Sequence, residues 1–157
     1  MARAFSQIGE ERERSVKALK RCHEDGLTDG SMADFFFPGL REVGLNEQHD
    51  EWFEQTWEAH AQVLKRYPKS HNTMNSLAWT AARANRRLPE ARTMLVEALK
   101  LQPRQAAYLD TMGEIYFAER NRGKALEWSR KAVIRQPGDE MLLRQFDRFE
   151  SGPFPLD

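Results

Sequence analysis

The sequence predicts an all-α protein built from repeated helical hairpins. Three prolines each follow an amphipathic stretch, at spacings of 35 and 34 residues: Pro68, Pro103 and Pro137. Small residues recur 34 positions apart between these prolines: Ala91 with Ala125, and Ala98 with Ala132. The apolar residues around them follow the spacing of a helix face. A period of this length is typical of stacked helical repeats, so we expect a solenoid-like arrangement.

The composition is that of one folded domain. The chain has 157 residues, of which 40% are hydrophobic and 31% are charged. This balance predicts a soluble chain with one packed core. No run of about 18 apolar residues occurs, and the first ten residues lack the apolar core of a signal peptide. Cys22 is the single cysteine, which excludes an internal disulfide and fits a reducing compartment. We therefore expect a cytoplasmic protein with no membrane partner.

The charges balance overall but are unevenly distributed. Lys plus Arg and Asp plus Glu each number 24. Residues 72–136 carry a net charge of +6, whereas residues 1–71 and 137–157 each carry −3. Most of the basic residues in the middle fall on expected turns and second helices, which favours a solvated outer surface over a phosphate-binding stripe. We expect no nucleic-acid partner.

The N-terminal part predicts a charged helix followed by an irregular hairpin. Residues 3–24 form a helix whose apolar positions are Phe5, Ile8, Val16, Leu19 and Cys22, and we interpret Cys22 as a packing residue. Residues 31–43 give the first helix of the hairpin, which Pro38 is expected to break or restart. Residues 46–67 give the second helix, with Trp52, Phe53 and Trp57 at helical spacing.

Two hairpins follow over residues 72–139. Ala78 or Gly113 in the first helix of each hairpin is expected to face Ala91 or Ala125 in the second, because helices approach closely only where small side chains meet. The first helices match at an offset of 35 residues and the second helices at 34. We therefore expect one additional residue in the first turn, around residues 84–88.

These two hairpins resemble tetratricopeptide repeats. The residues that carry the resemblance are Leu77-Ala78-Trp79, Pro89-Glu90-Ala91, Ala98-Leu99-Lys100-Leu101-Gln102-Pro103, Leu109-Asp110-Thr111-Met112-Gly113-Glu114-Ile115-Tyr116 and Lys124-Ala125-Leu126-Glu127-Trp128. Met74 and Ala81 depart from the family pattern, which prefers larger residues there. The resemblance implies a right-handed superhelix, an αα solenoid, that binds proteins and is not an enzyme.

A final helix is expected over residues 140–150, with Asp139 as its N-cap. Its apolar residues can cover the last hairpin as a cap, because a solenoid otherwise exposes its docking face to water. We divide the chain into 1–30 (N-terminal charged helix and loop), 31–71 (degenerate hairpin), 72–139 (two repeats) and 140–157 (capping helix and proline-containing tail). A segment cut from a longer protein would fit this organisation equally well.

The resemblance places the binding surface on the first helices of the hairpins, which line the concave face. The expected partner-binding residues are Asn72, Asn75, Ser76, Trp79, Arg83, Asp110, Thr111, Glu114 and Phe117. A peptide or protein segment would bind there, with Trp79 and Phe117 as aromatic anchors. Family members that bind chaperone C-termini hold a carboxylate with lysine and asparagine. The corresponding positions here are Asn75, Trp79, Ala107, Asp110 and Thr111, so we reject that partner class.

Other interpretations of the same residues stay open. Asp110 and Arg144, and Glu114 and Arg148, are each 34 residues apart and would form ion pairs between neighbouring first helices. Trp79 could instead be covered by the N-terminal helices. A structural subunit that assembles or self-associates through the aromatic helix at Trp52, Phe53 and Trp57, or through the repeat edge, is the alternative function.

Catalytic and metal-binding patterns are not found. The four histidines stand apart in sequence without a paired metal motif: His23, His49, His60 and His71. No glycine-rich phosphate loop occurs, and residues 25–36 lack the ligands of a calcium loop. We expect no cofactor, no metal and no enzymatic activity.

Overall fold

The chain folds entirely into helices over the residues that the structure describes. The computed structural model describes residues 2–30 and 32–155, with side chains for residues 11–30 and 33–155. Eight helices and no strand occur among them: α1 (Ala2–Asp25), α2 (Met32–Glu42), α3 (Asn46–Arg66), α4 (His71–Ala84), α5 (Leu88–Leu101), α6 (Ala106–Ala118), α7 (Arg122–Arg135) and α8 (Glu140–Ser151). None of these described helices is long and apolar enough to cross a bilayer.

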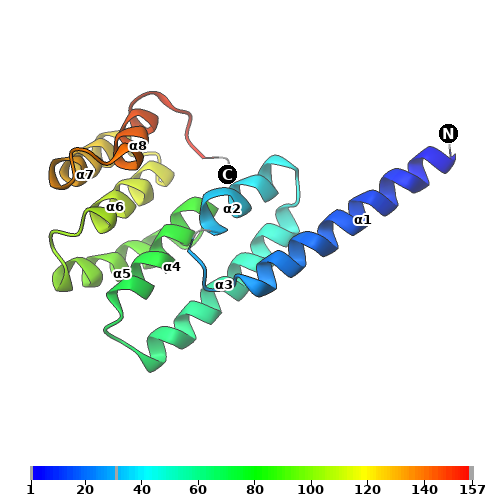
Figure 1. Cartoon of the computed structure of the whole chain (residues 1–157), viewed down its shortest axis with the longest axis horizontal. Helices are drawn as coiled ribbons and strands as arrows, with labels where there is room; N and C mark the ends of the chain where they lie inside the picture. The colour runs from blue at the N-terminus through cyan, green and yellow to red at the C-terminus, as the bar shows by residue number, and fades with distance from the viewer. Residues whose placement is uncertain (1, 31, 156–157) are drawn as a thin grey trace.

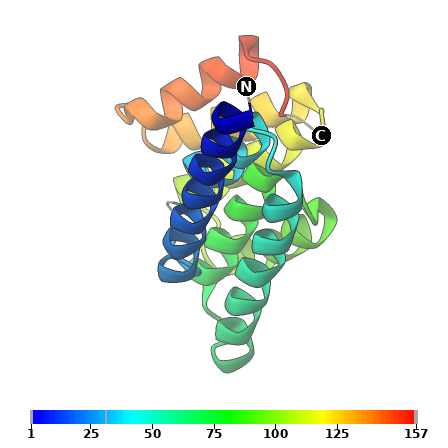
Figure 2. The same ribbon diagram turned by 90° about the vertical axis from the view of Figure 1, so that its right-hand side faces the viewer.

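Helices α2 to α7 form three consecutive hairpins. Helix α2 packs on α3, α4 on α5 and α6 on α7, while α2, α4 and α6 also pack on one another in sequence order. Figure 1 shows this stack, with α1 projecting from one end and α7 and α8 at the other. Figure 2 shows that α7 and α8 run across the direction of α3 to α5, so successive hairpins are rotated in the stack.

Small residues allow the two helices of the α4–α5 hairpin, and those of the α6–α7 hairpin, to pack closely. Ala78 and Ala91 are fully buried in one core cluster, and Ala125 is fully buried beside α6. At Gly113 an added Cβ would lie 3.2 Å from the Ala125 carbonyl oxygen and 3.0 Å from the Phe149 ring. The expected small-residue contact between Gly113 and Ala125 is therefore confirmed, and glycine is needed because both neighbours are close.

The helix ends follow the three prolines. Helices α3, α5 and α7 end two residues before Pro68, Pro103 and Pro137, and each C-cap amide still donates to the carbonyl four residues earlier. The extra residue of the first hairpin does not lengthen its turn. Helix α4 has 14 residues and α6 has 13, whereas the turns occupy 85–87 and 119–121. Asn85 ends α4 in the left-handed conformation, with φ of 53°.

Pro38 does not break α2, contrary to the sequence expectation. The helix continues from Met32 to Glu42 through Pro38, whose missing N–H leaves the Asp34 carbonyl without its usual helical donor. Arg83 of α4 supplies the replacement, because its Nη2 donates to the Asp34 carbonyl oxygen at 3.0 Å. A side chain 49 positions away thus donates to the carbonyl that Pro38 leaves without a helical donor.

The N-terminal helices enclose an aromatic core. His23 stacks on Trp52 with ring centroids 5.6 Å apart and on Phe36 at 5.8 Å, and Phe53 is fully buried beside Phe37. Trp52 is 2% exposed, so neither it nor Phe53 is available as the assembly surface considered from the sequence.

Helix α1 docks on this core through its last turns. Val16 and Leu19 pack on the core cluster, but Cys22 is exposed, so its interpretation as a packing residue is wrong. Phe5 and Ile8 lie outside the described side chains.

Helix α8 begins where the sequence predicted. The Asp139 carboxylate accepts from the backbone amides of Met141 at 2.9 Å and Leu142 at 3.2 Å, which confirms its role as the N-cap. Leu142 packs beside Ala132 of α7, and Phe149 is fully buried against Phe117 of α6. After Ser151 the chain leaves the helix and remains non-helical through Pro155.

Candidate functional site

An open groove of about 790 Å³ crosses α2, α4, α6 and α8. These are the first helices of three successive hairpins and the helix that follows them. The groove is lined by Gly30, Asp34, Phe35, Asn75, Ser76, Trp79, Arg83, Ala107, Asp110, Thr111, Gln136, Asp139, Met141, Leu142, Arg144, Gln145 and Arg148. Its walls therefore come from sequence positions more than 100 residues apart.

Six of the nine residues predicted to bind a partner line this groove: Asn75, Ser76, Trp79, Arg83, Asp110 and Thr111. The other three lie elsewhere. Asn72 accepts a hydrogen bond from the Tyr108 hydroxyl at 2.6 Å. Phe117 is fully buried, with its ring centroid 4.9 Å from that of Phe149, so it is not an aromatic anchor for a ligand. Glu114 is also fully buried, and its carboxylate is occupied by side chains of the chain itself.

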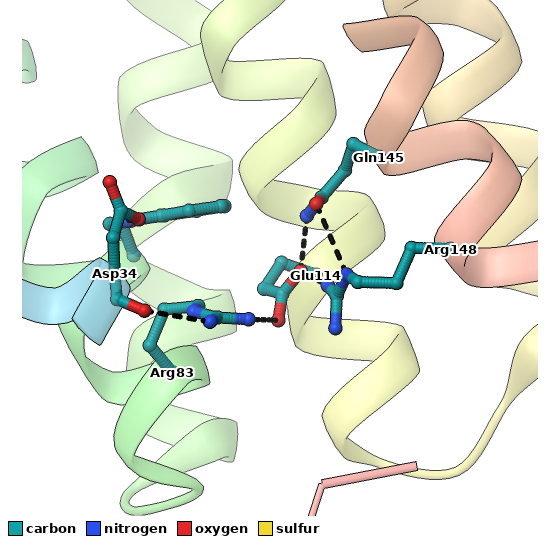
Figure 3. A network of polar contacts seen from close by, with 6 residues as sticks. Asp34, Arg83, Glu114, Gln145 and Arg148 are labelled. Atoms are coloured by element: carbon teal, nitrogen blue, oxygen red, sulfur yellow. Dashed lines mark hydrogen bonds and ion pairs between the residues drawn. The ribbon is translucent and has the colours of Figure 1, made fainter. Parts of the chain in front are cut away.

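The Glu114 carboxylate joins α4 to α8. Arg83 Nη1 donates to Glu114 Oε1 at 3.1 Å, and both Arg148 and Gln145 donate to Glu114 Oε2. Arg148 also donates to Gln145 Oε1 at 3.2 Å, which fixes the two α8 side chains relative to one another. Figure 3 shows the Glu114 side chain between the arginines. Because buried charges are stable only when paired, this carboxylate is a structural group.

The same network reaches α2 through Arg83 and Trp79. Trp79 Nε1 donates to Asp34 Oδ1 at 2.9 Å, while Arg83 binds the Asp34 carbonyl. Trp79 is half-buried and still lines the groove, so the N-terminal hairpin covers it only in part. A continuous chain of polar contacts therefore runs from α2 through α4 and α6 to α8, as Figure 3 shows for its labelled members.

Of the two ion pairs considered from the sequence, the structure contains one. Glu114 pairs with Arg148, whereas Arg144 pairs with Glu140 of its own helix at 3.4 Å. Asp110 Oδ1 is buried and has no hydrogen-bond partner among the residues that the structure describes. Burial raises the pKa of the Asp110 carboxyl to about 8, and the neighbouring Glu114 charge adds to this shift. Asp110 is therefore largely protonated at pH 7.

Asn75 holds the matching position one repeat earlier. It precedes Asp110 by 35 residues, the offset that relates the two first helices. Asn75 Oδ1 is likewise buried without a hydrogen-bond partner. Buried polar atoms are normally hydrogen-bonded, so two such oxygens at equivalent points of one groove are unusual. Both are suited to accept hydrogen bonds from a bound molecule.

The groove also has apolar anchors that sequence reasoning did not assign to it. Phe35 of α2 is 85% exposed and Met141 of α8 is 69% exposed, although both are large apolar residues. The sequence contained a signal for Phe35, because three consecutive phenylalanines, residues 35–37, cannot all face one side of a helix. Phe37 is buried and Phe36 partly buried, which leaves Phe35 outside the core.

The described side chains do not assemble a metal centre, since no group of three or more potential His, Cys, Asp or Glu ligands occurs among them. Three buried histidines have structural roles. His23 shares a 2.8 Å hydrogen bond with the Thr56 hydroxyl, His60 contacts the Thr56 carbonyl at 3.0 Å, and His49 accepts from Arg41 Nε at 3.2 Å. Burial lowers the pKa of each histidine, which favours the neutral ring.

Several basic residues of the repeat core pair with the acidic N-terminal segment. Arg86 contacts Asp50 at 2.8 Å and Arg87 contacts Glu54 at 2.6 Å, both from the turn after α4 to helix α3. Arg122, expected on a solvated outer surface, instead donates to backbone carbonyls at the end of α8 and in the tail. Some of the basic residues of the repeat core therefore make ion pairs and hydrogen bonds within the chain.

Comparison with known proteins supports the tetratricopeptide resemblance. The chain is similar to a TPR repeat-containing protein of Pseudomonas aeruginosa, with 34% identity over 79 residues. This match spans 50% of the chain and 13% of the relative, so the chain corresponds to a small part of that protein. No family model matches the chain.

Proposed function

We propose that this chain is a non-enzymatic protein–protein interaction scaffold that binds an extended segment of a partner in the groove across α2, α4, α6 and α8. The similarity to a TPR repeat-containing protein supports an interaction module built from helical hairpins. The groove supports the choice of face, because it combines exposed apolar side chains with polar groups that have no hydrogen-bond partner among the described residues.

The exposure of Phe35 on α2 and Met141 on α8, which both line the groove, is the observation that carries this proposal. Large apolar side chains that remain this exposed around a concavity are typical of binding surfaces. Each can contact an apolar side chain of a bound segment. The groove volume of about 790 Å³ is large enough for several side chains of a peptide.

The unpartnered oxygens of Asn75 and Asp110 favour an extended partner over a helical one. An extended segment presents backbone N–H groups, whereas the N–H groups of a helix are already bonded within it. We take the Asn75 and Asp110 oxygens as the acceptors for such N–H groups. In this proposal the path between the Asn75 and Asp110 oxygens is lined by Ser76, Trp79 and Thr111. Arg83 belongs to the network of polar contacts around Glu114.

We further infer that the hairpins form a right-handed superhelix with α8 as its cap, divided as the sequence predicted into 1–30, 31–71, 72–139 and 140–157. The rotation of successive hairpins and the burial of Leu142 and Phe149 support this organisation. The lone cysteine fits a cytoplasmic location. Of the three arginines that line the groove, Arg83 and Arg148 already bind the buried Glu114 carboxylate, which leaves Arg144, in an exposed pair with Glu140, to bind a ligand carboxylate. This argues against a chaperone C-terminus as partner.

An assembly subunit is the second proposal, now restricted to the repeat edge. Ile134 of α7 is 68% exposed and Leu143 of α8 is 42% exposed, and neither lines the groove. These residues could contact another subunit or a second copy. Light scattering at high concentration tests self-association, and a strictly monomeric mass would remove that version.

The groove proposal is tested by capturing partners from source cells with matched surface variants. Phe35→Ser and Met141→Ser remove the apolar anchors, and Ile134→Ser removes an equally exposed residue outside the groove. We expect both groove variants to lose most of the captured partner and the Ile134 variant to retain it. Equal capture by all three variants, with unchanged circular dichroism, would contradict the groove as the binding face.

A further inference from the structure

The segment that follows α8 folds back onto the helical stack. It leaves the helix at Gly152, where an added Cβ would lie 2.6 Å from the Arg148 carbonyl oxygen. Only glycine tolerates so close an approach to backbone without displacement. The sequence then continues as Pro153-Phe154-Pro155, which cannot form helix or donate from its prolines. Its position therefore depends on contacts with other elements.

Those contacts are specific and centre on Arg122 and Phe154. Arg122 Nη2 donates to the Gly152 carbonyl oxygen at 2.8 Å, and its Nη1 donates to the Phe149 carbonyl oxygen. The same guanidinium lies 4.7 Å from the centre of the Phe154 ring. The Phe154 ring in turn packs on Phe117, with centroids 5.0 Å apart. One cation and one aromatic surface thus hold both the backbone and the side chain of the segment.

The segment also bounds a second cavity, of about 310 Å³. This cavity is lined by Pro38, Arg41, Glu42, Arg83, Arg148, Pro153, Phe154 and Pro155, so the tail faces α2 across it. Arg83 and Arg148 line both this cavity and the groove, and both bind Glu114. These contacts of Glu114 with the two arginines, here called the Glu114 bridge, therefore form the wall between the cavity and the groove.

We propose that the surface formed by Phe117 and Arg122 is a second recognition site, which takes an extended segment with an aromatic residue between two prolines and is occupied here by the chain's own residues 153–155. Prolines restrict such a segment to extended conformations, so little conformational entropy is lost when it binds. The aromatic ring supplies the anchor and the arginine selects a backbone with free carbonyls. The tail acts as a tethered ligand. Once the Phe154 ring has been removed from the tail, the site binds the same segment when it is supplied as a separate peptide.

The experiment uses the full chain with Phe154→Ala and a fluorescein-labelled peptide of residues 151–157. In the unmodified chain the tethered segment competes at high effective concentration and excludes the peptide. We expect Phe154→Ala to bind the peptide at least about tenfold more tightly than the unmodified chain in an anisotropy titration. Tyr67→Ala removes an aromatic residue that is 57% exposed and lines neither the groove nor the second cavity, and it should behave as the unmodified chain does.

Two further measurements make the proposal falsifiable. A peptide in which Phe154 is replaced by alanine should not bind, and adding Arg122→Ala to Phe154→Ala should return the titration to the level of the unmodified chain. Equal binding of both peptides, or no gain in a Phe154→Ala chain that keeps its helical circular dichroism, would overturn the site. Absence of nuclear Overhauser contacts between Phe154 and Phe117 in the unmodified chain would overturn the tethered arrangement. None of these readouts depends on the groove, so they leave the proposed function to its own test.

Discussion

Gly113 illustrates how one residue sets the distance between helices. It lies within α6 at a point where the backbone of α7 and the ring of Phe149 both come close. Glycine costs about 1 kcal/mol relative to alanine in a helix interior, so its presence here needs a packing reason. The sequence provided that reason through the recurrence of small residues, and the structure adds Phe149 as a third participant.

Gly113→Ala should lower the free energy of unfolding by about 1–3 kcal/mol, because overpacking outweighs the gain in helix propensity. The matched control is Gly39→Ala in α2, where an added Cβ meets nothing within 4 Å. That substitution should be neutral or stabilise by up to about 1 kcal/mol. Urea unfolding of the two variants checks the difference, and equal effects would contradict the close contact.

The raised pKa of the Asp110 carboxyl predicts that the stability of the chain depends on pH. Its pKa of about 8 in the folded chain lies above its ordinary value of 3.8, so the folded state holds the proton more tightly than the unfolded state. The stability present at acid pH is therefore lost progressively as pH rises from about 4 to 8. The charged and titratable groups around it are Glu114, Arg148 and Asp139.

Asp110→Asn removes this titration and keeps the shape of the side chain. We expect the variant to gain stability relative to the unmodified chain as pH increases from 5 to 8, measured by urea unfolding at each pH. The three buried histidines contribute an opposite loss of stability below about pH 6.5 in both chains, which cancels in the comparison. A difference that does not change with pH would show that Asp110 is ionised in the folded state.

At the scale of helices, contacts between residues distant in sequence accompany the features that local sequence patterns do not specify. The positions of the hairpins, the proline stops and the Asp139 cap follow from local rules, and the sequence predicts them correctly. Local rules do not predict the continuity of α2 through Pro38, where Arg83 of α4 donates to the Asp34 carbonyl that the proline leaves without a helical donor. The burial of Trp52 and Phe53 likewise depends on His23 and Phe37 of other helices. Local propensity contains no information on such contacts.

The Glu114 bridge joins α4 and α8 through a carboxylate that is fully buried. Glu114→Gln removes the charge that compensates Arg83 and Arg148, and we expect a loss of roughly 2–4 kcal/mol in unfolding free energy. The value lies below that for a fully buried pair because the Arg148 side chain is 31% exposed and screened by water. Urea unfolding measures this loss.

Arg144→Ala provides the comparison, because Arg144 lies on α8 beside Gln145 and one turn before Arg148. Its ion pair with Glu140 is exposed on both sides, so its loss should cost under about 1 kcal/mol. A Glu114→Gln chain as stable as Arg144→Ala would mean that the bridge does not hold α4 and α8 together. The sequence identified the Glu114–Arg148 pair by its repeat spacing but had no means to include Arg83 as its second cation.

At the scale of the whole molecule, the stack of first helices creates a surface that no single hairpin possesses. The groove draws on α2, α4, α6 and α8, and its two exposed apolar residues come from the first and last of these. Six of its lining residues are among those that the tetratricopeptide resemblance placed on the binding face. The resemblance missed Phe35 and Met141, because these lie on the helices outside the two regular repeats, where register alone does not specify orientation.

The most direct test of the groove as the binding face is site-specific photo-crosslinking in source cells. A benzophenone amino acid placed at Met141, which is 69% exposed in the groove, is compared with one at Ile134, which is 68% exposed on α7 outside it. Because the two positions are equally accessible, random collisions label them equally. We expect a discrete partner adduct from position 141 and none from position 134. The same adduct from both positions, or from position 134 alone, would contradict the groove as the binding face.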